Sequence, residues 1–166
     1  YGDLAAIEDR EVNPRRAIAA YTEALQYYTP AIAPLDYAMT QNNLGNAYRY
    51  LAAIEDREDN LRRAITAFTE ALKYSRPDAT PLNYATMQNN LGAIYRNLAK
   101  LEDREGNLRR AIAAFTEALQ YRTPAAAPLA YAMTQANLGN SWEDSGDLAG
   151  AVACWRAAEV YYRRMG

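Results

Sequence analysis

The sequence repeats itself at an interval of 47 residues, and this periodicity constrains the fold more than any other feature. The octapeptide Leu-Ala-Ala-Ile-Glu-Asp-Arg-Glu at residues 4–11 returns unchanged at 51–58, and it returns as Leu-Ala-Lys-Leu-Glu-Asp-Arg-Glu at 98–105. A fixed period of this size is typical of stacked arrays, in which each unit packs only against its neighbours. Such arrays present extended surfaces rather than active-site pockets, which favours a binding scaffold over an enzyme.

Each unit is predicted to contain a longer first helix that starts at a proline. In the second unit the helix is expected to run from Pro34 to about Glu55, because proline is well tolerated at the first helical position. Apolar residues recur along it at helical spacing, at Tyr37, Leu44, Tyr48 and Leu51. Small residues form the neighbouring stripe and would let a partner helix approach closely, at Ala38, Gly45 and Ala52.

A shorter second helix is predicted to follow the charged octapeptide. Asparagine is a strong N-cap residue, so these helices are expected to start at Asn13, Asn60 and Asn107. Proline-bearing connectors at 28–33, 75–80 and 122–127 then lead to the next unit. No segment alternates with the period of two that marks a half-buried strand. The expected fold class is therefore all-α, built of antiparallel helix pairs.

The periodicity places the units at about 1–43, 44–90, 91–137 and 138–166 of a single array. Tyr1 aligns with Tyr48, so the first unit is expected to lack the front of its first helix. Arrays normally need polar terminal units to remain soluble and monomeric. We therefore expect end-to-end contact between chains near Tyr1, Leu4 and Tyr21; the alternative is that residues 1–11 fold over their own end.

Composition argues against several functional classes. The formal net charge of −2 gives no reason to expect a nucleic acid or an anionic membrane as partner. Histidine is absent, which removes the commonest general base and the commonest metal ligand. The single cysteine, Cys154, fits a reducing compartment and is interpreted as a packing residue. We expect a cytoplasmic, non-catalytic protein without cofactor or metal.

The motifs of the chain resemble those of the tetratricopeptide repeat family, whose usual unit has 34 residues. Leu44-Gly45-x-x-Tyr48 is followed by Ala64-x-x-x-Phe68, and the same pattern returns at 91–95 and 111–115. The last unit keeps the ordinary spacing, with Leu138-Gly139-x-x-Trp142 before Ala151-x-x-x-Trp155. One departure is glutamine where the family usually has tryptophan, at Gln41, Gln88 and Gln135.

The resemblance implies a right-handed superhelical solenoid that binds proteins or peptides. The strings at 37–49 and 59–65 are also similar to arrays of bacterial proteins that carry a CHAT protease or a signalling NTPase domain. That narrower resemblance implies a scaffold or sensor module from a larger signalling protein. The alternative is a structural or engineered near-consensus array that mainly associates with itself.

By the same resemblance, the first-helix face opposite the core stripe would line a concave, peptide-binding groove. Asparagine offers both donors and acceptors to a peptide backbone, and arginine offers a fork for carboxylates. We therefore expect acidic or carboxyl-terminal segments to bind near Arg49 and Arg96, or else these side chains only solvate the helix or bond neighbouring repeats. The candidate residues are Met39, Asn42, Asn46, Arg49, Tyr50, Asn89, Arg96, Asn97, Asn140 and Glu143.

Two further repeated features are interpreted as structural. The Glu-Asp-Arg-Glu segments at 8–11, 55–58 and 102–105 could supply metal ligands or catalytic carboxylates, but a solvated turn paired with the following arginines is the preferred interpretation. The recurring tyrosines could form a ligand cage, but aromatic residues at helical spacing usually belong to a core.

Overall fold

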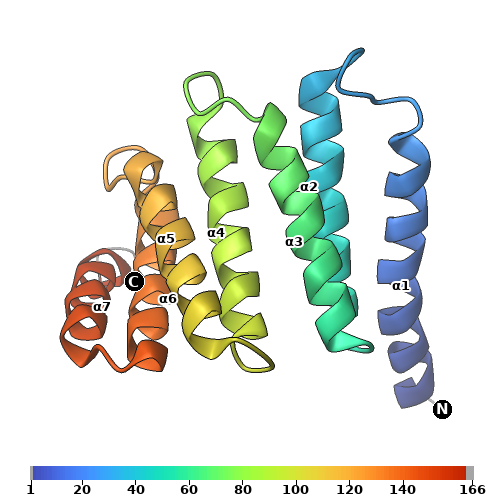
Figure 1. The fold of residues 1–166 in the computed structure, drawn as a ribbon. Helices are drawn as coiled ribbons and strands as arrows, with labels where there is room; N and C mark the ends of the chain where they lie inside the picture. The colour runs from blue at the N-terminus through green and yellow to red at the C-terminus, as the bar shows by residue number, and fades with distance from the viewer. Residues whose placement is uncertain (1, 164–166) are drawn as a thin grey trace. The chain divides into compact units, whose positions relative to one another are not determined.

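The computed structural model describes residues 2–163, with side chains from residue 13 onward. Those residues form seven helices and no strand (Figure 1), which confirms the all-α class. The chain divides into two compact units, Tyr1–Ser75 and Arg76–Gly166. The first contains three helices and the second contains four: α1 (Gly2–Ala24), α2 (Pro34–Leu51) and α3 (Arg57–Tyr74), then α4 (Pro81–Leu98), α5 (Arg104–Tyr121), α6 (Pro128–Ser145) and α7 (Leu148–Tyr162).

The first helices α2, α4 and α6 begin at the predicted prolines and are 18 residues long. Helices α2 and α4 continue past Tyr48 and Tyr95, as expected, but they end at Leu51 and Leu98 rather than near Glu55. The chain turns there because the Leu51 carbonyl accepts hydrogen bonds from the backbone N–H groups of Ile54 and Glu55, both at 2.9 Å. The inserted residues therefore form a compact turn instead of a longer helix.

The predicted starts of the second helices were wrong by one helical turn. Asp56 and Asp103 are the N-cap residues, in the left-handed region with φ of 39° and 35°, which aspartate tolerates better than most residues. Asn60 and Asn107 lie inside α3 and α5, 4% and 1% exposed. Each donates a 2.9 Å side-chain hydrogen bond back to the carbonyl of Glu55 or Glu102. These asparagines hold the preceding turn rather than cap the helix.

The first unit also differs from the expectation of a turn at residues 8–11 and a new helix at Asn13. Residues 2–24 form one continuous helix with Pro14 inside it. An internal proline removes one backbone hydrogen bond, so Pro14 does not favour a helix that runs through it. The side chains of residues 8–11 lie outside the described residues.

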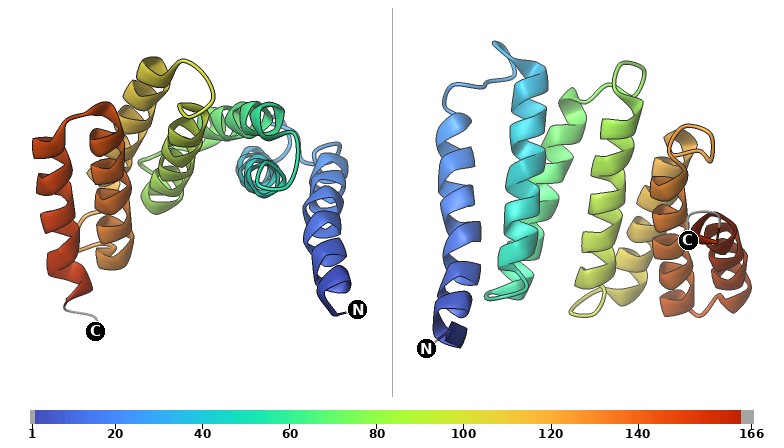
Figure 2. Two further views of the ribbon diagram at one scale, coloured as in Figure 1. Left: turned by 90° about the horizontal axis from the view of Figure 1, so that it is seen from below. Right: turned by 180° about the vertical axis from the view of Figure 1, so that it is seen from behind.

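Within each pair the helices run antiparallel (Figures 1 and 2). The two helices pack closely at a glycine. A Cβ atom on Gly45 would lie 2.9 Å from the ring of Phe68, and one on Gly92 would lie 2.9 Å from the ring of Phe115. Both phenylalanines are fully buried. The small-residue stripe therefore serves close helix approach, as predicted.

The recurring tyrosines belong to the packed interfaces of the pairs. Tyr37, Tyr84 and Tyr131 make edge-to-face contacts with Tyr74, Tyr121 and Tyr161, with ring centroids 5.2–5.4 Å apart. The amides of Gln41, Gln88 and Gln135 donate to the three hydroxyls of the first set at 3.0–3.1 Å. The glutamines that replace the usual tryptophan thus satisfy a half-buried phenol.

Because of this packing, we expect the stability of the protein to fall at alkaline pH. Desolvation raises the pKa of Tyr84, and its carboxylate neighbour Glu117, which accepts from the phenol at 3.3 Å, adds to the shift. The folded state therefore favours the neutral phenol, and its contribution is complete below the unfolded pKa of about 10 and is lost as the pH rises further. Tyr84→Phe should flatten the fall in thermal midpoint between about pH 9 and pH 12. An unchanged slope would contradict this assignment; Tyr162→Phe on the exposed end of α7 is the control.

The repeated acidic segments form some of the predicted ion pairs with the arginines that follow them, as in Arg62–Glu58 and Arg109–Glu105, and neighbouring residues supply others. Arg62 binds Glu58 and Arg63 binds Asp59, both at 2.8 Å, and Arg15 of α1 reaches Glu55 in the turn between α2 and α3. Except for Glu55, which is 32% exposed, these side chains are at least half exposed, so each pair contributes little to stability.

Candidate functional site

Five of the predicted groove residues lie on α2, which we call the α2 face: Met39, Asn42, Asn46, Arg49 and Tyr50. Met39 and Tyr50 are 53% and 57% exposed, and the other three are half-buried. The Arg49 guanidinium carbon lies 4.6 Å from the centroid of the Tyr50 ring, a distance that permits a cation–π interaction.

Two buried polar atoms on the α2 face have no hydrogen-bond partner among the described residues. They are Oδ1 of Asn42 and Nε of Arg49. A buried polar group without a partner costs about 1–3 kcal/mol and calls for an explanation. Both atoms belong to residues that the sequence singled out, and they lie two helical turns apart, about 10 Å along the axis.

The counterparts of these residues one repeat later show which partners the two atoms prefer. Nε of Arg96 donates to Asp144 at 2.6 Å, and both side chains are about three-quarters buried. Oδ1 of Asn89 accepts from the Thr134 hydroxyl at 3.2 Å and from the Asn137 amide at 3.3 Å. In the compact unit that spans residues 76–166, this face therefore joins α4 to α6. Asn89 and Arg96 thus bond a neighbouring repeat, which is the alternative to peptide binding given above.

The remaining candidates, Asn97, Asn140 and Glu143, do not form a single site with the α2 face. Asn140 accepts a 3.1 Å hydrogen bond from the indole of Trp155 in α7, so it serves the last helix pair. Asn97 is half-buried at the end of α4, and Glu143 is exposed on α6. Their role in binding remains a prediction.

Sequence reasoning missed a buried arginine in the connector before α6. Arg122 is 8% exposed and donates to the hydroxyls of Thr134 and Thr86, both at 2.9 Å. Desolvation lowers the pKa of Arg122. Its equivalent one repeat earlier is Ser75, and this departure from the repeat was the available signal. Because it ties α4 to α6, we assign Arg122 to the core.

Metal and thiol chemistry receive no support from the described part of the chain. Residues 13–163 contain no cluster of three or more side chains able to hold a metal ion. Cys154 packs against the core around Phe115, and burial followed by the charge of Asp147 raises the pKa of its thiol. A raised pKa disfavours the thiolate, which supports a packing role for Cys154.

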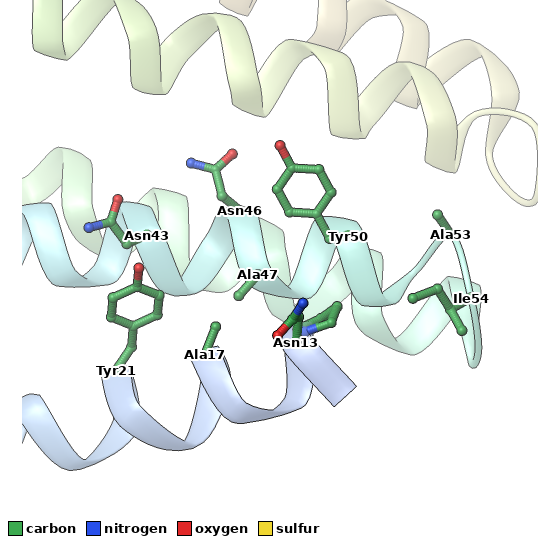
Figure 3. Close-up of a pocket in the computed structure, with 10 residues that line it drawn as sticks. Asn13, Ala17, Tyr21, Asn43, Asn46, Ala47, Tyr50, Ala53 and Ile54 are labelled. Carbon is green, nitrogen blue, oxygen red and sulfur yellow. The ribbon is translucent and has the colours of Figure 1, made fainter. Parts of the chain in front are cut away.

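A pocket of about 750 Å³ lies between α1 and α2 (Figure 3). Ala17 and Tyr21 stand on α1, and Ala47 of α2 lies across from Ala17. Asn46 and Tyr50 of the α2 face also line this pocket, together with Asn13, Pro14, Asn43, Ala53 and Ile54. The end-to-end contact predicted at Tyr1 and Leu4 involves side chains outside the described residues, whereas Tyr21 of the same edge lies in the pocket.

Comparison with known proteins agrees with the repeat pattern. A family model described as tetratricopeptide repeat matches residues 38–78 and 85–125. Among solved structures the chain is similar to BtubC (BKLC) from P. vanneervenii, with 24% identity and a TM-score of 0.57, covering 98% of this chain and 61% of that one. It also matches MamA, with 19% identity and a TM-score of 0.48, over 89% of this chain and 88% of that one. No curated protein matched the sequence.

The helices are paired, a Leu-Gly-x-x-aromatic motif recurs in the first helices, and these helices carry a polar face. These features define a helical-repeat scaffold of the kind that binds other proteins. The chain belongs to the tetratricopeptide repeat family, and its helices recur at the 47-residue spacing of the sequence. It spans about three-fifths of the length of the BtubC chain. None of the helices in residues 2–163 is both long enough and apolar enough to cross a membrane.

Proposed function

We propose that the chain binds an acidic segment of a protein or peptide along the α2 face, without catalysing a reaction. The observation that carries this proposal is the pair of buried, unpartnered atoms, Oδ1 of Asn42 and Nε of Arg49. A carboxylate satisfies the equivalent nitrogen of Arg96, and N–H and O–H donors satisfy the equivalent oxygen of Asn89. The preferred ligand therefore offers one carboxylate and one hydrogen-bond donor.

The spacing of the two atoms limits the ligand further. Seven residues of α-helix span about 10 Å, and an extended peptide covers the same distance in about three residues. An Asp, a Glu or a terminal carboxylate about three residues from a backbone N–H group would reach both atoms. The Tyr50 ring, stacked with Arg49, holds the guanidinium in place for that contact.

The cellular setting is proposed from the resemblance of the sequence. We infer a scaffold or sensor module of a larger bacterial signalling protein, acting in the cytoplasm. The match over 61% of the BtubC chain is compatible with a module of a longer protein. A structural array whose main partner is a second copy is the competing proposal.

Selection of peptides from a random library on the full chain tests the proposal. The selected peptides should be acidic, and Arg49→Met should weaken their binding roughly tenfold to a hundredfold, since hydrogen bonds to charged groups contribute about 1.5–3 kcal/mol. Asn42→Leu should weaken binding less. Arg109→Met is the matched control, because Arg109 is 73% exposed and pairs with the exposed Glu105.

Two results would count against this function. If Arg49→Met lowers the thermal midpoint but leaves peptide affinity unchanged, the arginine serves repeat packing, as Arg96 does. If the selected peptides carry no excess of acidic residues, the carboxylate assignment is wrong.

A further inference from the structure

We propose that a second pocket, between α5 and the end of α6, binds a short segment of a partner protein in which an apolar side chain lies close to a carboxylate. The pocket has a volume of about 380 Å³, near the lower end of the range for ligand sites. It therefore accommodates one or two side chains. This contact differs from that of Asn42 and Arg49 and does not depend on it.

Four positions that line this α5–α6 pocket also line a smaller pocket, of about 230 Å³, in the first compact unit. They are Arg109, Ile112, Trp142 and Ser145, which align with Arg15, Ile18, Tyr48 and Leu51 two repeats earlier. The smaller pocket is also lined by Glu55 and Asp56 of the turn between α2 and α3. Comparison of the two pockets therefore shows what normally occupies the space.

In the first unit that turn supplies a carboxylate. Glu55 accepts a 3.0 Å hydrogen bond from Nε of Arg15 and also binds its Nη2 group, which makes the contact bidentate. Residues 52–56 connect α2 to α3, whereas the two residues Gly146 and Asp147 connect α6 to α7. The shorter connection has no counterpart of Glu55 to offer Arg109. Among the described residues Arg109 pairs with Glu105 of its own helix, at 3.4 Å.

The α5–α6 pocket also differs in its apolar content. Leu51 and Leu98 end α2 and α4 and are 7% and 4% exposed. The equivalent residue at the end of α6 is Ser145, which is exposed. Serine is shorter than leucine, so space stays open beside the half-buried Ile112 and Trp142. Burial of an apolar side chain in this space is favourable.

The charges around the pocket favour an acidic partner. Arg104 and Arg109 line it together with two acids, Glu105 and Asp144. The Asp144 carboxylate already binds Arg96 at 2.6 Å, and the Asp144 carbonyl accepts from Arg104 at 2.6 Å. Glu105 is 82% exposed, so its long contact with Arg109 leaves that guanidinium open to a second carboxylate. The three arginines outnumber the two acids.

The chain contains a model of the occupant in residues 51–55. The Leu51 carbonyl accepts from the N–H groups of Ile54 and Glu55, both at 2.9 Å, so this segment holds a leucine and a glutamate in one turn. A partner segment with the same two side chains within one turn offers an apolar group for the space at Ser145. It also offers a carboxylate for Arg109.

The probe is the capped peptide acetyl-Leu-Ala-Ala-Ile-Glu-Asp-amide, residues 51–56, added to the full chain and followed by NMR of the two tryptophan indole N–H groups. Trp142 lines the pocket, whereas the indole of Trp155 donates to Asn140 within the α6–α7 pair. The Trp142 signal should shift saturably, and the Trp155 signal should stay in place.

A matched peptide tests the charge. With Glu55→Gln and Asp56→Asn the peptide keeps its shape and loses both carboxylates. It should bind about twofold to fivefold more weakly, the effect of an exposed ion pair.

Three protein variants locate the contact. Ser145→Leu restores the residue of the other repeats and fills the pocket, so it should weaken binding about tenfold or more by steric exclusion. Ala153→Leu adds apolar bulk at an exposed position of α7 outside the lining residues, and it should bind within about twofold of the parent. Arg109→Met should weaken this peptide about twofold to fivefold while leaving peptides held by Arg49 unaffected.

Four outcomes would overturn the proposal. The first is no saturable shift of the Trp142 signal up to about 5 mM peptide, well above a millimolar Kd. The second is equal affinity of the uncharged peptide, and the third is unchanged affinity in Ser145→Leu. The fourth is a concentration-dependent increase in the mass of the protein alone that Ser145→Leu abolishes, which would make a second copy the occupant. Failure of the Arg49→Met test would leave all four readouts unaffected.

Discussion

Replacing Phe115 with alanine should destabilise the second unit by about 3–5 kcal/mol, the largest effect we expect from a single substitution. The ring is fully buried at the centre of a cluster with Ala111 and Leu138, and it packs against the backbone of Gly92. Glycine offers no side chain that could move into the vacated space, so most of the cavity should persist. Urea denaturation followed by circular dichroism measures the loss.

Phe68→Ala is the matched change in the first unit, because Phe68 makes the same contact with Gly45. The two losses should be similar in size. Phe115→Leu should cost less, since it leaves a smaller cavity. A loss below about 1 kcal/mol for Phe115→Ala would show that the helix pair can collapse around the cavity.

Replacing Asn107 with alanine should cost about 1–3 kcal/mol, although the change removes only one small polar side chain. The amide of Asn107 donates to the Glu102 carbonyl at 2.9 Å and accepts from Arg110 at 3.1 Å. Its removal takes the Asn107 donor away from the Glu102 carbonyl. The next residue, Asp103, has its backbone in the left-handed region. Thermal denaturation by circular dichroism measures this change.

Asn60→Ala tests the same contact in the first unit, where the amide donates to the Glu55 carbonyl at 2.9 Å. Arg109→Ala is the exposed control and should change stability by less than about 0.5 kcal/mol. If Asn107→Ala were as mild as that control, the hydrogen bond from Asn107 to Glu102 would not anchor the turn.

Much of the fold could be predicted because the same helix-start and packing residues occur in several repeats. The prolines at 34, 81 and 128 mark helix starts, and the stripe of small residues that includes Gly45 marks a close helix contact, so the all-α class followed from the sequence. The helix ends were less predictable. Aspartate and asparagine both favour N-caps, and only the packed turn shows that Asp56 and Asp103 are the caps.

The candidate site was predicted in part. The sequence selected Asn42 and Arg49 as polar residues on a helix face, but the same argument also selected Asn89 and Arg96. Those two differ because Thr134, Asn137 and Asp144 lie within hydrogen-bonding distance of them. Partners 45–48 residues away in the chain cannot be recognised from helical spacing alone.

The sequence by itself determined that this protein is a helical repeat scaffold, because helical periodicity, capping and close glycine contacts are local properties that recur every 47 residues. Only the tertiary structure decided which copy of each repeated residue is paired and which is not. Burial and hydrogen bonding depend on what lies across from a residue, and the repeats differ in this respect although their sequences are nearly the same. Tyr21 and Phe115 hold equivalent positions. Tyr21 lines a pocket, whereas Phe115 is the centre of a core because α4 packs on that face of α5.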